Sequence, residues 1–129
     1  MSFFKNIFNS SDDNDSNEKK IDWKELTDIG QLNEISAISN EKAVAIFKHS
    51  TRCSVSRMAL KQFENEFNSS DKVTPYFLDL IAHRDISNEI ANRFGVPHQS
   101  PQLILIKEGK AIYHVSHSDI DAEALKGKV

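Results

Sequence analysis

Residues 43–56, AVAIFKHSTRCSVS, decide the fold of this chain. The first seven are nearly continuously apolar and rich in β-forming residues, which predicts a central strand buried on both faces. A polar turn that ends at Cys53 follows, and the segment after it has helical periodicity. The apolar positions of that predicted helix are Val55, Met58, Ala59, Phe63 and Phe67. We therefore predict a buried strand, a polar turn and a long helix in succession.

Strands and helices alternate on both sides of this unit. Upstream, Asp28 is placed to cap a helix, whose apolar residues recur about once per turn at Ile29, Leu32, Ile35 and Ile38. Downstream, residues 73–81 predict a second strand, in which Pro75 indicates an end or an edge position. A further helix is predicted to open at Asp85 and to end at Gly95.

The pattern changes in the last quarter of the chain. Residues 102–107 and 110–116 predict a hairpin of two strands joined by a glycine-containing turn. Ser118 and Asp121 form a capping box for a last helix, and an initial strand is placed around residues 21–23. These elements predict an α/β fold with a mixed central sheet. The sheet has a parallel βαβ core and a C-terminal β-hairpin, with helices on both faces.

Length, charge and cysteine content exclude several function classes. The 129 residues are enough for one ordinary domain, and the net charge of -3 argues against non-specific nucleic-acid binding. No apolar run approaches the roughly 20 residues that span a bilayer. The single cysteine excludes an internal disulfide and a multi-cysteine zinc site, so no metal site is expected. A lone thiol also indicates a reducing, cytoplasmic location.

Residues 1–20 differ in composition from the remainder of the chain. Positions 9–20 are all polar or charged, which predicts a disordered N-terminal leader ahead of one domain at residues 21–129. The alternative is an apolar anchor for a partner or a membrane surface, formed by Phe3, Phe4, Ile7 and Phe8.

Cys53 occupies a position suited to thiol chemistry. It lies between a strand and the first turn of a helix, where free N–H groups and the helix dipole favour an anion. Arg52, Arg57 and a protonated His49 would favour the thiolate further. Ser56, three residues on, is expected to donate its hydroxyl to the sulfur. The alternative is that Cys53 is a small buried hydrophobe, although polar residues flank it on both sides.

Ser100 and Pro101 immediately precede a predicted strand. Proline bonds at tight, buried bends are where cis peptides occur, and a cis-proline loop facing Cys53 would offer a backbone edge to an extended disulfide substrate. The alternative is a trans proline that opens an edge strand.

Three short blocks together resemble a known family. They are FKHSTRCSVS at residues 47–56, SPQ at residues 100–102 and SH at residues 116–117. The chain resembles the YtxJ-like monothiol bacilliredoxins over residues 21–129, which implies a thioredoxin-like fold. The resemblance implies that Cys53 is the redox thiol and that Pro101 is the cis-proline. It places Ser56 where dithiol relatives carry a resolving cysteine.

The resemblance also implies a co-substrate and a mechanism. Bacillithiol, a cysteinyl-glucosaminyl-malate thiol, would be the co-substrate, with no bound cofactor, and bacillithiolated cytosolic proteins would be the partners. Its malate favours a basic rim, for which Arg52, Arg57 and His98 are candidates. The chain departs from the family at Ser54, where proline is common, and at Ser118, where tryptophan is frequent.

Two other function classes remain open at this stage. A thioredoxin-like adaptor would use the cis-proline groove without turnover and with an inert Cys53. A monothiol-glutaredoxin-like iron–sulfur carrier would hold a cluster through one cysteine per subunit. Such carriers typically show C-G-F-S, whereas this chain has Ser54 in place of the glycine.

Overall fold

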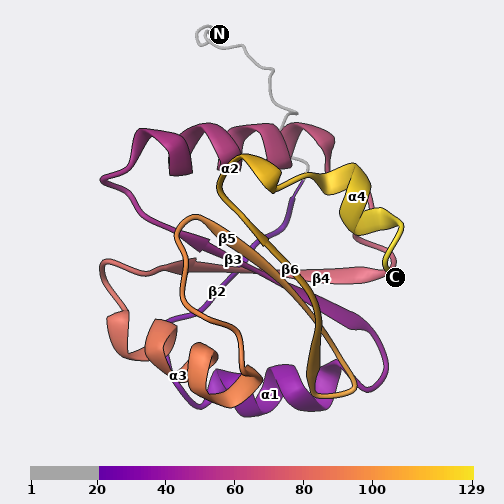
Figure 1. Ribbon diagram of the computed structural model, residues 1–129. Helices are drawn as coiled ribbons and strands as arrows, with labels where there is room; N and C mark the ends of the chain where they lie inside the picture. Colours follow the sequence, from indigo (N-terminus) through magenta and orange to yellow (C-terminus); the bar gives the residue numbers. More distant parts are fainter. Residues whose placement is uncertain (1–20) are drawn as a thin grey trace, which may run out of the picture.

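The computed structural model describes residues 21–129, which form a five-stranded sheet in the order β2-β4-β3-β5-β6. The predicted leader at residues 1–20 lies outside the described residues. Helices α2 and α4 cover one face of the sheet, and α1 and α3 cover the other (Figure 1). This is the mixed, doubly covered α/β sheet that the sequence predicts.

The parallel half of the sheet carries the cysteine turn. Strand β3 (Ala43–His49) runs parallel to β4 (Val73–Asp79), and β4 pairs in turn with the short β2 (Lys24–Glu25). Every residue of β3 is buried, as its apolar pattern predicts. The carboxyl end of β3 therefore holds the following turn at a fixed edge of the sheet.

The antiparallel half consists of the predicted hairpin. Strand β5 (Gln102–Lys107) pairs with β3 on one side and with β6 (Lys110–Ser116) on the other. Glu108 and Gly109 form the turn with φ angles of 53° and 75°, the positive values that two-residue hairpin turns require. Both of their N–H groups donate to Ser39, which anchors the turn to the end of α1.

Two apolar layers hold the helices to the sheet. Helices α1 (Gln31–Ile38) and α3 (Arg84–Phe94) pack on one face, and α2 (Ser54–Glu66) and α4 (Ala122–Lys126) pack on the other. Consecutive residues of β3 alternate between the layers, as the pleat requires. The first layer includes Leu32, Ile35, Val44, Ile46, Leu78, Ile86, Ile90 and Ile104. The second includes Ala45, Phe47, Phe63, Phe67, Leu103, Leu105 and Leu125.

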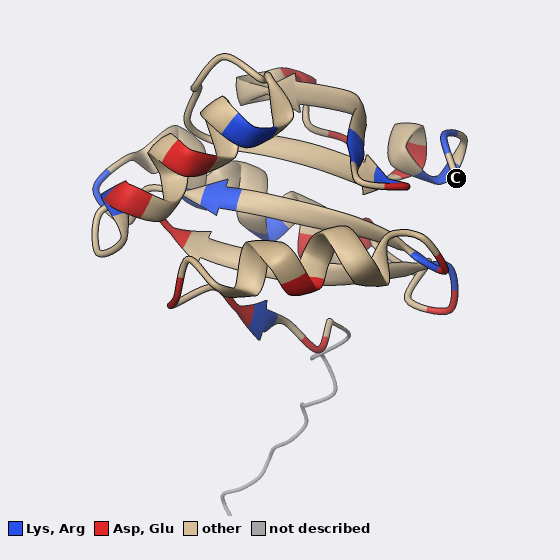
Figure 2. Ribbon diagram, turned by 90° about the horizontal axis from the view of Figure 1, so that it is seen from below, with Lys and Arg blue, Asp and Glu red and all other residues tan. Residues whose placement is uncertain are grey.

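Charged residues lie mainly on helices and turns and at strand ends, with both signs interspersed on the face seen in Figure 2. Helix α3 ends as predicted, because Gly95 caps it with a φ of 67°. Within residues 21–129, no helix has both the length and the apolar character needed to span a membrane.

Several predicted boundaries are wrong. Helix α1 begins at Gln31 rather than after Asp28, because the Asp28 carboxylate accepts from the N–H of Gly30 in a local turn that precedes the helix. The first described strand is β2 and not residues 21–23, since its pairing with β4 begins at Lys24. Pro75 lies in β4, an interior strand of the sheet, one residue before the position that pairs with β2.

The predicted capping box near the C-terminus is also wrong. Residues His117–Asp119 form a short 3-10 helix, η1, instead of the approach to a cap. Helix α4 starts later, and Asp121 is itself the N-cap, accepting from the N–H of Glu123. Ser118 therefore has no capping role.

Candidate active site

Cys53 is the N-cap residue of α2. Its extended backbone, with φ -113° and ψ 122°, makes the bend between the turn after β3 and the helix. The N–H of Cys53 donates to the carbonyl of Ser50 at 3.2 Å, and its carbonyl accepts from the N–H of Arg57 at 3.1 Å. The residue is half-buried. A thiol is thus held at the end of the helix that favours an anion, still partly open to a substrate.

The hydroxyl of Ser56 connects the strand to the helix. Ser56 is fully buried; its Oγ accepts from the N–H of Ser50 at 3.0 Å and lies 2.8 Å from Nδ1 of His49. The hydrogen bond expected from Ser56 to Cys53 is not among those of the described residues. The side chain instead fixes the end of β3 against the first turn of α2, and it is inaccessible to a substrate.

His49 lies beside this connection and is itself buried. Burial lowers its pKa, and the positive charge of Arg57 acts in the same direction, while Asp79 and Glu64 oppose the shift. The imidazole is therefore neutral at pH 7 and adds no positive charge near Cys53. The idea that a protonated His49 stabilises the thiolate does not fit this geometry.

The Ser100–Pro101 peptide bond is cis, and Pro101 is buried. Because Lys48 of β3 pairs with Gln102 of β5, Pro101 lies at the same end of the sheet as the cysteine turn. The Pro101 carbonyl accepts from the N–H of His117 at 3.0 Å. This bond gives His117, which has a φ of 56°, a backbone role in holding the proline loop. The Ser100 hydroxyl is buried without a partner among the described residues.

The three residues of the expected basic rim differ in character. Arg52 and Arg57 are exposed, and Nη1 of Arg57 donates to the carbonyl of Thr51 at 3.2 Å, which braces the turn. His98 is an exposed residue whose Nδ1 lies 2.9 Å from Nζ of Lys48. Burial of its ring and the positive charges of Lys48 and Arg84 lower the pKa of His98. The charged form of His98 is therefore disfavoured, which makes it the weakest candidate of the three for a basic rim.

Lys48 is a residue that our reading of the sequence missed. It is fully buried on β3, and burial lowers its pKa to about 8. Its ammonium group donates to Oε1 of Gln102 at 3.2 Å as well as contacting His98. The signal was present in the sequence, because a lysine interrupts a strand predicted to be buried on both faces.

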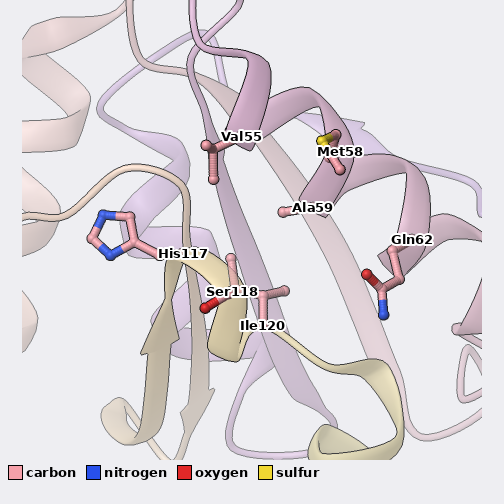
Figure 3. Close-up of a pocket in the computed structure, with 7 residues that line it drawn as sticks. All are labelled: Val55, Met58, Ala59, Gln62, His117, Ser118 and Ile120. Carbon is pink, nitrogen blue, oxygen red and sulfur yellow. The ribbon is translucent and has the colours of Figure 1, made fainter.

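An apolar cavity of about 200 Å³ opens beside the site. It lies between α2 and the segment after β6 (Figure 3), where residues of α2 face Ser118 and Ile120. Val55 and Met58 line it and are 48% and 72% exposed, although they share the helical spacing of the buried Phe63. The cavity begins two residues from Cys53.

A sequence model of the monothiol bacilliredoxin BrxC family matches residues 24–125. The chain belongs to this family. The match includes Cys53, Ser56 and Pro101, and it confirms the resemblance seen in the sequence.

Solved structures similar to this chain confirm the thioredoxin fold. A thioredoxin-fold protein described as a candidate oxidoreductase is 31% identical, with a TM-score of 0.68 over 80% of this chain and 89% of that chain. The thioredoxin Mala s 13 of Malassezia sympodialis is 21% identical (TM-score 0.66; 85% and 90% covered). The thioredoxin of Trypanosoma brucei brucei is 17% identical (TM-score 0.64; 88% and 92% covered). The last two show the fold alone.

Proposed function

We propose that this chain is a monothiol oxidoreductase that removes bacillithiol from mixed disulfides on cytosolic proteins. The observation that carries the proposal is the pairing of the chain's single cysteine with a buried serine at the resolving position. Cys53 supplies a partly exposed thiol at a helix start, but Ser56 has no sulfur and cannot reach a substrate. The second half of any exchange must then use an external thiol.

The reaction proceeds in two exchanges. The Cys53 thiolate attacks the bacillithiol sulfur of the mixed disulfide; a new disulfide forms between Cys53 and bacillithiol while the protein leaves as its thiolate. A second bacillithiol thiolate then attacks the sulfur of bacillithiol on Cys53. This releases bacillithiol disulfide and restores the thiolate. Each cycle thus consumes one free bacillithiol; the released bacillithiol disulfide contains that molecule and the one removed from the protein, and a separate reductase supplies the two electrons that return both to thiols.

The surroundings of Cys53 suit a small anionic thiol attached to a protein. Arg52 and Arg57 provide positive charge for the malate carboxylates. The cavity beside α2, at about 200 Å³, is smaller than the roughly 300–1,000 Å³ of pockets that enclose a whole small molecule. We infer that bacillithiol is held at an open surface, with only part of the substrate in contact with the cavity. Such a site also admits the protein to which the thiol is attached.

The direct test follows the bacillithiol adduct by mass spectrometry. A model protein carrying one bacillithiol is mixed with the full chain and excess bacillithiol. We expect the adduct to leave the substrate and to appear transiently on Cys53, with the Cys53→Ser variant as the inactive control. If Cys53 never acquires the adduct, the proposal fails and a non-catalytic adaptor becomes the better reading.

A second assay separates monothiol from dithiol chemistry. Insulin contains internal disulfides, so the first attack on one leaves the enzyme covalently bound to its substrate. Escape then requires a resolving thiol, which this chain does not have. We expect poor insulin reduction in a system coupled to thioredoxin reductase, and efficient reduction would contradict the monothiol assignment.

A further inference from the structure

A group of polar side chains lies on the α3 side of the sheet, opposite to the face covered by α2; Lys48, Gln102 and Ser87 are buried, and His98 is exposed. Its centre is the Lys48 ammonium group, 2.9 Å from Nδ1 of His98 and 3.2 Å from Oε1 of Gln102. Ser87 of α3 also approaches Nδ1 of His98, at 3.2 Å. We call Lys48, His98, Gln102 and Ser87 the Lys48 cluster.

The buried charge of the Lys48 cluster destabilises the fold. Lys48 is 0% exposed, and no carboxylate lies within ion-pair distance of it anywhere in residues 21–129. A buried cation without a counter-ion is destabilising, and an apolar side chain of similar length would fill the same space at no electrostatic penalty. Departures of this kind from the rules of core packing are expected at functional positions.

The contacts of the cluster lead to the proline loop. Gln102 donates through Nε2 to the carbonyl of Pro97 at 3.1 Å, which closes the segment of residues 97–102 on itself. From the end of β3, the ammonium group of Lys48 contacts this closed segment at two side chains, His98 and Gln102. Two residues after Lys48, directly beyond the end of β3, the Ser50 carbonyl accepts from the N–H of Cys53. One strand end thus holds both the proline loop and the cysteine turn.

We propose that Lys48 is a positioning residue for disulfide exchange. Through His98 and Gln102 it holds the loop that carries Pro101 in the position beside Cys53 that exchange requires. This inference rests on the proposed exchange activity but not on the identity of the small thiol. A substrate's backbone lies along the proline loop, so the position of this loop determines how well the substrate disulfide is presented to the Cys53 sulfur.

The hydrogen-bond directions in the cluster follow from its chemistry. An ammonium group has only donors, so Nδ1 of His98 must accept, and the proton of the neutral ring sits on Nε2. The charged or titratable groups that face His98 are Lys48 from β3 and Arg84 from α3, and both are cations. Protonation of His98 would place a donor against a donor and open the contact. Acidification would therefore remove one of the two contacts by which Lys48 holds the loop, while the bond to Gln102 remains.

The test compares Lys48→Met with wild type and with the control Lys107→Met, which changes an exposed lysine at the far end of β5. One peptide is prepared as two mixed disulfides, one with bacillithiol and one with cysteine. For Lys48→Met we expect an unchanged or higher Tm and iodoacetamide alkylation of Cys53 within about twofold of wild type. We expect kcat/KM to fall about tenfold on both disulfides, mainly through KM. The Lys107→Met control should match wild type.

A spectroscopic readout tests the contact independently of activity. The ring ¹⁵N shifts of His98 should report an unprotonated Nδ1 in wild type at pH 7, and the apparent titration midpoint of the ring should rise in Lys48→Met when the neighbouring cation is removed. His98→Leu, which deletes the acceptor, should lower kcat/KM as Lys48→Met does. If Lys48→Met is well folded and exchanges both disulfides at the wild-type rate, the inference is wrong. It is equally wrong if Tm and alkylation fall in parallel with exchange, because Lys48 would then be purely structural.

The proposed function fails in a different way. A wild-type protein that exchanges the cysteine disulfide but never the bacillithiol disulfide refutes the bacillithiol assignment. In that case the effect of Lys48→Met on the cysteine disulfide still decides the positioning role. Loss of exchange on both disulfides in wild type would refute both proposals.

Discussion

Replacing Ser56 with alanine removes the hydroxyl that joins β3 to α2, and the structure sets the size of the effect. The N–H of Ser50 loses its acceptor at a buried position, and Nδ1 of His49 loses its neighbour. An unsatisfied buried donor costs about 1–3 kcal/mol. We therefore expect Ser56→Ala to lower the free energy of unfolding by about 2 kcal/mol and Tm by roughly 8 °C. The chain should still fold.

The single tryptophan provides the assay. Trp23 packs against Phe47 and Phe63, with ring centroids 6.1 and 6.0 Å away, so its fluorescence reports on the layer beneath α2. Urea titrations of wild type and Ser56→Ala should differ in midpoint and not in slope. The matched control is Ser54→Ala, which removes an exposed hydroxyl from the same helix and should change stability by less than about 0.5 kcal/mol.

A parallel measurement of Cys53 alkylation distinguishes a structural role of Ser56 from a direct contact with the thiolate. Because no hydrogen bond joins Ser56 to the sulfur in the described part of the chain, the alkylation rate should change by less than about threefold. Unchanged stability combined with a tenfold or larger fall in alkylation would refute the structural role. It would restore the direct contact with the thiolate that the sequence suggested.

Three further predictions concern the same end of the sheet. Ser54→Pro should raise stability by about 0.5–1 kcal/mol, visible as a higher Tm, because Cys53 already has the extended backbone that a following proline requires. Burial lowers the pKa of His49, so below pH 6.5 the unfolded chain binds a proton that the folded chain rejects; stability should fall with acidification, and less steeply in His49→Gln. Burial also lowers the pKa of Lys48 from 10.5 to about 8. Stability measured in urea should therefore rise between pH 8 and 10.5 by up to roughly 3 kcal/mol, and Lys48→Met should abolish this rise.

Much of the fold was predictable because its signals are local. A nearly continuous apolar run defines β3, and two β-rich segments on either side of Gly109 define the hairpin. Gly95 ends α3 at a φ that other residues rarely adopt. The succession of strand, cysteine turn and helix follows from the same local patterns, whereas the thioredoxin-like fold was implied by the family resemblance. Each of these features depends on residues that are neighbours in the sequence.

The errors occur where distant contacts decide the structure. Strand β2 is two exposed charged residues whose strand character comes only from pairing with β4. Val55 and Met58 have helical spacing but line an open cavity, because periodicity identifies a face of a helix and not what covers it. The hydrogen-bond partners of Ser56 could not be predicted from the sequence either. A hydroxyl three residues after a cysteine is expected to face the sulfur. The Ser56 hydroxyl instead contacts His49 and Ser50 at the end of β3.

The placement of Lys48 and His49 explains how one strand end can build a two-part site. Consecutive residues of a strand point to opposite faces, so His49 meets Ser56 on the α2 side while Lys48 meets His98 on the α3 side. The first contact positions the helix that Cys53 caps, and the second positions the loop that contains Pro101. Because both originate from adjacent residues of a fully buried strand, a shift of that strand moves the thiol and the proline loop together. Their separation is then insensitive to such a shift. Substitutions at Lys48 or His49, by contrast, should displace one half of the site relative to the other. For this reason the two positions are expected to affect exchange more than a substitution of equal stability cost elsewhere in the sheet.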